Sequence, residues 1–247
     1  MKKIYLFGLL LAGVLLGLTS CNDDNDELTD SRLTYYADLQ MQGDEFMLVP
    51  VGSNFVDPGC TGTLAGEDIT SKIVVEGADE VDPNTLGFYY ITYSAVGSDG
   101  YPASVERTVC VYDPSITLDI SGFYDVDMNA SMYQKARTYA DRAAYYGNTS
   151  QCTGIEFTQI VPGIFYVNDI FGGWYEQIRG YGARYAMTAY VSVDNDGNIG
   201  LLSSYIAGWG DGIDYLDEGK FEDGTITYSL CYAGQIYMDL VLNRVSE

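Results

Sequence analysis

Residues 87–95 read GFYYITYSA, and this stretch decides the fold class. Tyr89, Ile91, Tyr93 and Ala95 occupy alternate positions, so their side chains fall on one face of an extended chain. A period of two is typical of a β-strand that buries one face. The segment therefore predicts a sheet with this face against a core.

Short strands of the same kind recur along the whole chain, between turn signals such as Asp57-Pro58-Gly59 and Pro162-Gly163. Strands are predicted over residues 33–39, 45–51, 73–76, 88–95 and 105–112, and then over 121–133, 154–161, 164–168, 185–193, 199–206, 220–222, 225–232 and 236–242. Only residues 134–146 have a helical composition. We predict an all-β chain, in which a sandwich is followed by an antiparallel barrel or a second sandwich.

The composition excludes several functional classes. The chain has 35 Asp and Glu against 12 Lys and Arg, for a formal net charge of -23, which disfavours nucleic acid as a partner. It has no histidine, so catalytic Ser–His and Cys–His pairs and histidine metal ligands are excluded. We expect no enzyme activity and no cofactor.

The N-terminus has the pattern of an export signal. Residues 1–3 are Met-Lys-Lys, and residues 4–18 form an apolar run that is too short to span a membrane. The sequence Leu18-Thr19-Ser20-Cys21 follows and resembles a bacterial lipobox, in which the cysteine is lipidated. We predict a signal peptide over residues 1–20 and a lipid anchor on Cys21, with an ordinary secretory signal as the alternative.

Residues 22–27, NDDNDE, are polar and acidic, so they are expected to form part of a flexible tether over residues 21–32. This run also resembles the export signal of Bacteroidetes surface lipoproteins. The resemblance implies an outer-membrane protein that is lipid-anchored at the cell surface; a plain solvated linker is the alternative.

The first folded segment resembles bacterial immunoglobulin-like (Ig-like) domains. The motifs are FVDPG at residues 55–59, GEDIT at 66–70, GFYYITY at 87–93 and RTVCV at 107–111. The resemblance implies an Ig-like sandwich over residues 33–114 that acts as a spacer or stalk.

The second folded segment is similar to C-terminal domains of Bacteroidetes lipoproteins that accompany glycan-uptake systems. The motifs are GIEFTQI at residues 154–160, FGGWY at 171–175 and GYG at 180–182. We expect a lipocalin-like antiparallel barrel, or a sandwich, over residues 115–247.

Four cysteines remain after Cys21, namely Cys60, Cys110, Cys152 and Cys231. An exported protein can pair them as disulfides. Cys110 alternates with the inward Val109 and Val111, so it is expected to face away from the core, which argues against a bond to Cys60. Free thiols are the favoured interpretation, and pairing of Cys152 with Cys231 stays open.

A candidate binding site lies in the second domain, where aromatic residues occur among glycine-rich loops. Flat aromatic faces stack on sugar rings, and Tyr and Trp suit sites that are partly wet. Asp169 and Gln177 are further candidates for binding sugar hydroxyls. The proposed ligand-binding residues are Trp174, Tyr175, Arg179, Tyr181, Arg184, Tyr185, Trp209 and Asp211. The alternative is that these aromatics belong to the core.

Two acidic segments are candidates for metal or catalytic sites. Residues 194–198, DNDGN, resemble the start of a calcium loop but lack its distal Glu, so a hairpin turn is preferred. Asp211, Asp214, Asp217 and Glu218 could bind calcium or supply a glycosidase pair, but a solvated loop is preferred. We predict no metal site.

These observations favour a non-catalytic surface lipoprotein. We expect membrane attachment through the lipid, and a barrel that binds glycan or assists an outer-membrane uptake complex. The alternative is a structural or adhesive protein that contacts other proteins.

Overall fold

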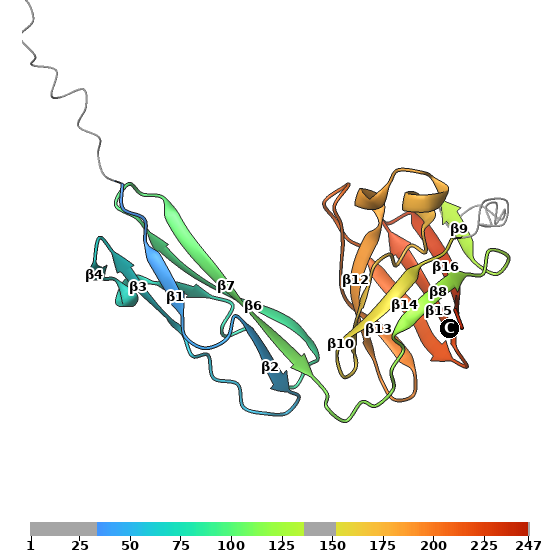
Figure 1. Ribbon diagram of the computed structural model, residues 1–247, viewed down its shortest axis with the longest axis horizontal. Helices are drawn as coiled ribbons and strands as arrows, with labels where there is room; N and C mark the ends of the chain where they lie inside the picture. The colour runs from blue at the N-terminus through green and yellow to red at the C-terminus, as the bar shows by residue number, and fades with distance from the viewer. Residues whose placement is uncertain (1–33, 136–151, 247) are drawn as a thin grey trace, which may run out of the picture.

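The computed structural model describes residues 34–135 and 152–246 (Figure 1). The predicted signal peptide, the lipidation site Cys21 and the tether lie outside the described residues. Most of the predicted helical segment over residues 134–146 lies outside them too, and its first two residues belong to strand β9 (Met132–Lys135).

Two small sheets form the N-terminal part, and we call them the Ig-like sheets. One has the order β1 (Asp38–Met41), β3 (Cys60–Leu64), β4 (Glu67–Asp68), with the 3-10 helix η1 (Thr70–Lys72) after it. The other has the order β2 (Phe46–Pro50), β7 (Pro102–Tyr112), β6 (Gly87–Val96), β5 (Val74–Glu76). Strand β2 runs parallel to β7, and the other neighbours are antiparallel. The Ig-like prediction is confirmed.

The alternation in residues 87–95 places the core of these sheets as expected. Ile91, Tyr93 and Ala95 are buried, and Ile91 and Tyr93 pack with Val109 and Val111 of β7. Two strands were missed, because β3 reads CTGTL and β4 reads ED, and neither shows an apolar alternation. The first strand also begins later than predicted, at Asp38 instead of residue 33.

A buried arginine completes this core. Arg107 lies on the inward face of β7 and is 0% exposed. Its guanidinium donates hydrogen bonds to the carbonyl oxygens of Gln42 (2.7 Å), Asp44 (2.7 Å) and Gly59 (3.2 Å). Because each of these carbonyls belongs to a loop, a single side chain holds the β1–β2 and β2–β3 connections onto the sheet.

Arg107 also has an anionic partner. Its Nε lies 3.4 Å from Oδ1 of Asp57 and 3.2 Å from the hydroxyl of Tyr93. The Tyr93 hydroxyl in turn donates to Asp57 at 2.5 Å. Burial, followed by the bond to Asp57, raises the pKa of Tyr93 to about 12. The motif at residues 55–59 thus contributes the counterion of this network.

The C-terminal part is a closed antiparallel barrel, which we call the barrel. Its strands pair in the order in which they occur along the chain: β8 (Gly122–Val126), β10 (Ile155–Val161), β11 (Ile164–Val167), β12 (Met187–Val193), β13 (Asn198–Ile206), β14 (Tyr215–Glu222), β15 (Thr225–Tyr232) and β16 (Ile236–Arg244). Strand β16 closes it by pairing with both β15 and β8, while β9 pairs with the other end of β16. Of the two predicted architectures, the barrel is confirmed.

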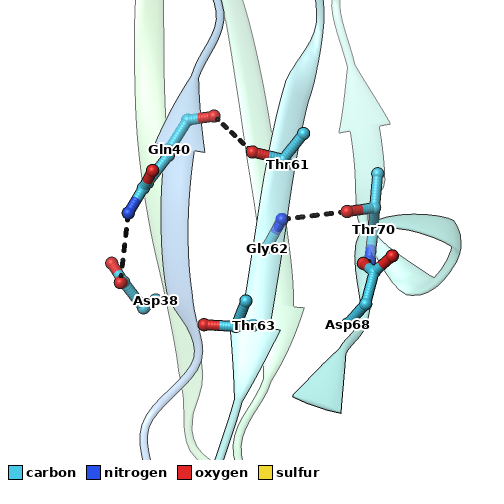
Figure 2. Close-up of a pocket in the computed structure, with 7 residues that line it drawn as sticks. All are labelled: Asp38, Gln40, Thr61, Gly62, Thr63, Asp68 and Thr70. Carbon is cyan, nitrogen blue, oxygen red and sulfur yellow. Dashed lines mark hydrogen bonds between the residues drawn. The ribbon is translucent and has the colours of Figure 1, made fainter. Parts of the chain in front are cut away.

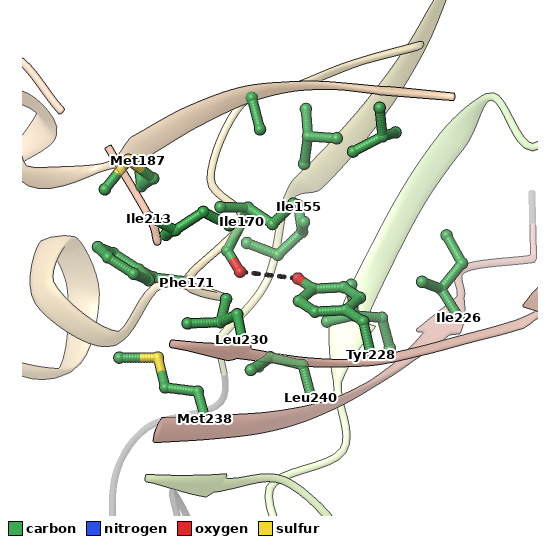
Figure 3. Packing of buried hydrophobic residues seen from close by; sticks show 14 of the residues in the cluster. Ile155, Ile170, Phe171, Met187, Ile213, Ile226, Tyr228, Leu230, Met238 and Leu240 are labelled. Carbon is green, nitrogen blue, oxygen red and sulfur yellow. Dashed lines mark hydrogen bonds between the residues drawn. The ribbon is translucent and has the colours of Figure 1, made fainter. Parts of the chain in front are cut away.

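Side chains fill the barrel interior (Figure 3). Strand β12 alternates between buried and partly buried positions along its whole length, as expected for a barrel strand whose residues face the interior and the exterior in turn. Tyr228 is buried among Ile155, Leu230 and Leu240, and its hydroxyl donates to the carbonyl of Ile170 at 2.8 Å. The interior is therefore a packed core, so a ligand is expected to bind at an end or on the outer surface.

The two parts touch through a small apolar contact. Phe88, Cys110 and Tyr112 on the outer face of the four-stranded sheet form one cluster with Val161, Ile164 and Leu202 of the barrel. The ring centroids of Phe88 and Tyr190 lie 4.7 Å apart. Cys110 does face away from the Ig-like core, as its position beside Val109 predicts, and the barrel covers it.

Candidate functional site

The candidate site is a cluster of aromatic side chains at one end of the barrel, built mainly by the connection from β11 to β12 (Figure 1). This connection contains the π-helix η2 (Trp174–Ile178) and the 3-10 helix η3 (Ala183–Tyr185). We call the set the barrel-end cluster; its members are Tyr133, Phe171, Trp174, Tyr175, Tyr181, Tyr185, Trp209 and Tyr232.

A buried carboxylate fixes the start of the connection. Asp169 is 1% exposed and accepts hydrogen bonds from the backbone N–H groups of Phe171 (2.9 Å), Gly173 (3.1 Å) and Met187 (3.1 Å). Burial raises the pKa of Asp169 to about 7, although the three N–H donors oppose this shift. Asp169 was proposed as a contact for sugar hydroxyls; its burial instead makes it a positioning residue for the loop.

The inner half of the cluster is buried. Trp174 is 3% exposed and stacks on Tyr133 with ring centroids 4.2 Å apart, while the guanidinium carbon of Arg179 lies 4.9 Å from the Trp174 ring. Tyr175 is 7% exposed and meets the ring of Phe171 edge-on at 5.2 Å. Trp174 and Tyr175 therefore belong to the core, and neither presents an open face to a ligand.

The outer half of the cluster reaches solvent. Trp209 is 42% exposed and Tyr181 is 53% exposed, with ring centroids 6.4 Å apart. Tyr185 packs edge-on against Trp209 at 4.9 Å, and Tyr232 stacks below Trp209 at 5.8 Å. The Trp209 ring is thus supported on two sides by other rings while remaining partly open to solvent.

The polar candidates named around the cluster are exposed, and several of them bind neighbouring groups. Arg184 and Arg179 are exposed, and Arg184 donates to the carbonyl of Ala207 at 3.4 Å. Asp211 is exposed as well, but its carboxylate accepts the hydroxyl of Tyr232 at 3.0 Å. Gln177, also a candidate sugar contact, donates to the carbonyl of Thr153 at 3.0 Å and so joins the loop to the segment that precedes β10.

Gly208 allows the aromatic rings to approach the backbone. A Cβ atom at this position would lie 2.5 Å from two ring carbons of Tyr185 and 3.0 Å from the Arg184 carbonyl oxygen. No real Cβ is tolerated that close to a ring, so the glycine is required for the packing of Tyr185 against Trp209.

We expect Gly208→Ala to lower the free energy of unfolding of the barrel by about 1–3 kcal/mol, the usual cost of overpacking. The displaced Tyr185 ring should also change the emission of Trp209, which fluorescence measures. Gly200→Ala is the matched control, because its Cβ would meet only the Ser192 hydroxyl, at 3.0 Å, and that side chain can rotate. Equal effects of the two substitutions would contradict this role of Gly208.

Other hollows lie away from the barrel-end cluster. A polar groove of about 230 Å³ lies on the three-stranded sheet. Figure 2 shows residues that line it, among them Asp38, Gln40, Thr61 and Asp68. A second polar groove of about 290 Å³, on the outer face of β14 to β16, includes Asp217, Glu218 and Asp239. The structure thus separates the predicted acidic cluster, because Asp211 binds Tyr232 and Asp214 accepts the N–H of Gly234 at 2.7 Å.

The hairpin turn preferred for residues 194–198 is present in the structure, whereas Asp217 and Glu218 of the second acidic segment belong to strand β14 rather than to a loop. Asp194 accepts the N–H of Asn198 at 2.8 Å and closes a tight turn between β12 and β13. Within residues 34–135 and 152–246, no group of three or more Cys, Asp and Glu side chains is arranged to hold a metal ion. In the same residues, no helix is both long enough and apolar enough to cross a membrane.

Comparisons with known proteins give the family. A family of bacterial surface protein Ig-like domains matches residues 39–111, and a family of C-terminal domains matches residues 113–244, more than half of the chain. The crystal structure of the lipoprotein BT2262 from Bacteroides thetaiotaomicron is 35% identical over 85% of this chain and 100% of that chain, with a TM-score of 0.45. The chain belongs to the family of this lipoprotein.

The chain, which we call the lipoprotein from here on, has a second and weaker match among solved structures. The M60 catalytic domain with the CBM51-1 and CBM51-2 domains of Clostridium perfringens ZmpB is 15% identical, with a TM-score of 0.27, and the match covers 85% of this chain and 21% of that chain. No curated protein matches the lipoprotein.

The four cysteines of the lipoprotein that the structure describes are free thiols. Cys60 packs against the Ig-like core while Cys110 lies in the contact with the barrel, so the two face opposite ways. Burial raises the pKa of Cys110 and of Cys152 to about 11. These thiols are therefore poor nucleophiles at neutral pH.

Proposed function

We propose that the lipoprotein is a non-catalytic protein of the outer membrane, anchored at the cell surface through Cys21, whose barrel end binds a glycan. The single observation that carries this proposal is the partly open Trp209 ring, supported by Tyr185 and Tyr232 and adjacent to the exposed Tyr181. A preorganised ring loses little conformational freedom when a sugar stacks on it.

Charged and polar groups around these rings suit sugar hydroxyls. Arg184 is exposed on η3 beside Tyr185, and Asp211 follows Trp209 by two residues. The ligand-contacting set that we propose is therefore Tyr181, Arg184, Tyr185, Trp209 and Asp211. The buried Trp174 and Tyr175 support it from within, through the edge contact of Tyr175 with Trp209 at 4.8 Å, and the exposed Arg179 stacks on Trp174.

The test is affinity electrophoresis of residues 22–247 through a panel of polysaccharides. We expect one glycan to retard the protein, and Trp209→Ala or Tyr181→Ala to weaken that retardation at least tenfold, because truncating a central aromatic contact costs about 2 kcal/mol. Phe123→Ala is the control, since Phe123 is 54% exposed on β8, outside the barrel-end cluster. Retardation that survives both cluster substitutions would place the glycan elsewhere, and no retardation by any glycan would reject the proposal.

A second candidate function is contact with a protein partner, for example a component of an outer-membrane uptake complex. It is favoured by three apolar side chains on the outer face of the four-stranded sheet, those of Phe46, Leu48 and Tyr90. Their strand pairing places them on one face, because Leu48 pairs with Cys110, and Phe46 and Tyr90 both pair with Thr108. Phe46, Leu48 and Tyr90 are 44%, 49% and 51% exposed. This apolar strip continues the surface that the barrel already covers at Phe88 and Cys110.

A further inference from the structure

Four large apolar or aromatic side chains are exposed together at one end of the Ig-like sheets. Tyr35, Tyr36, Val96 and Tyr101 are 44%, 64%, 61% and 66% exposed, and we call this group the tip. Val96 ends β6 and pairs with Pro102 at the start of β7, so the tip surrounds the β6–β7 turn. Tyr101 lies on the turn, and Tyr35 and Tyr36 lie in the segment that is bonded to it, so the tip combines apolar rings with polar hydroxyls.

The backbone holds the tip in place. The N–H of Ser98 donates to the carbonyl of Tyr35 at 3.2 Å, and the N–H of Tyr35 donates to the hydroxyl of Ser98 at 3.2 Å. Within the turn, the N–H of Gly97 donates to the carbonyl of Tyr101 at 2.8 Å. The segment that enters the sheets is thereby fixed to the turn, and the rings extend from a rigid base.

The position of the tip in the chain suggests its partner. The described part of the chain begins at residue 34, beside the β6–β7 turn and at the end of the sheets away from the barrel (Figure 1). Thirteen residues separate Tyr35 from Cys21, a contour length of at most about 50 Å. A lipid on Cys21 would keep the tip within that distance of the bilayer surface.

We propose that the tip docks on the interfacial region of the bilayer to which Cys21 anchors the chain, with Tyr35, Tyr36 and Tyr101 at the level of the lipid headgroups. The proposal rests on the lipid anchor of the proposed function but is independent of glycan binding. Tyr is enriched at membrane interfaces because its ring is apolar and its hydroxyl polar.

Tethering explains how so small a surface can bind. A free tip of this size would bind a bilayer weakly, but attachment through a short linker gives an effective concentration in the millimolar range. Asp99 lies in the same turn, and its carboxylate accepts the N–H of Tyr101 at 3.1 Å. The docked tip would set the direction of the Ig-like sheets relative to the membrane.

The test uses the full acylated lipoprotein reconstituted in phosphatidylcholine vesicles, with and without brominated acyl chains that quench Trp emission on contact. Tyr101→Trp places a reporter in the tip. Asn84→Trp is the matched control, because Asn84 is exposed in the turn before β6. Strand β6 runs from Gly87 to Val96, so the two reporters lie roughly 30 Å apart along the sheet. The parent chain, with Trp174 and Trp209, supplies the background emission.

We expect brominated lipid to quench at least half of the emission that Tyr101→Trp adds, and to leave the emission added by Asn84→Trp unchanged. Equal quenching of the two reporters, or none of either, would overturn the proposal. A Tyr101→Trp emission that shifts with protein density in unbrominated vesicles, without quenching, would identify a second copy as the partner and also overturn it. Failure of the protein to float with the vesicles would reject the lipid anchor itself, and with it the docked tip.

Discussion

Replacing Arg107 by Met is expected to lower the free energy of unfolding of the Ig-like sheets by about 3–5 kcal/mol, the usual cost of removing one partner of a buried ion pair. The substitution leaves Asp57 without its cation and removes the donors from three loop carbonyls. Met fills a similar volume, so the loss reflects polar groups rather than a cavity. Without the guanidinium, we expect the β1–β2 and β2–β3 connections to unfold together with strand β7.

Spectroscopy can assign that loss to the correct part of the chain. Both tryptophans belong to the barrel, so their fluorescence follows the barrel alone, whereas far-ultraviolet circular dichroism follows both parts. In Arg107→Met we expect part of the dichroism to disappear at a lower urea concentration while the fluorescence midpoint stays nearly unchanged. Lys72→Met, at an exposed site in η1, should shift neither by more than about 0.5 kcal/mol. Coincident transitions in Arg107→Met would refute the assignment.

The second large effect concerns pH and the buried Asp169. Its pKa is raised to about 7 in the folded barrel, mainly by burial, against about 3.9 in an unfolded chain. Between these values the folded state keeps a proton that the unfolded state has released, so stability falls as pH rises from about 4 to about 7. The fall amounts to about 1.4 kcal/mol per pH unit, or roughly 4 kcal/mol in total.

Asp169→Asn should remove this dependence, because an amide does not titrate. It carries a constant cost from the lost acceptor for the N–H of Gly173, so the comparison is made on the slope of stability against pH. Urea unfolding followed by Trp fluorescence gives that slope for the barrel. Asp223→Asn, at an exposed turn position, should keep the parent slope. If the parent and Asp169→Asn have parallel pH profiles, the carboxylate is ionised throughout and the predicted shift is wrong.

Alternation of apolar residues was sufficient to predict most strands, because it reports directly which face is buried. Residues 87–95, 185–193 and 225–232 all fall within a residue or two of observed strands. It failed at β3, where Cys60–Leu64 is polar and Gly62 lets Ile69 and Ile73 pack beneath it. It also missed Arg107, because a charged residue on an inward face has no counterion that sequence spacing alone can identify.

The candidate site was predicted less well, for a related reason. The aromatic composition of the loops predicted which residues form the cluster. It could not distinguish the buried Trp174, which stacks on Tyr133, from Trp209, which reaches solvent. The distinction depends on how the connection between β11 and β12 folds over the barrel end, which Asp169 fixes through contacts with residues up to 18 positions away. The apolar contact around Cys110 likewise joins segments that no local pattern relates.

The closing role of β16 has a consequence for the order in which the chain acquires structure. Every strand of the Ig-like sheets has been synthesised by Tyr112, so these sheets can form while the rest of the chain is still emerging. The barrel cannot close until residues 236–244 are present, because β8 and β15 otherwise remain as two unpaired edges. During synthesis and export the second half therefore passes through a stage with open edges that invite aggregation, and its last strand ends that stage.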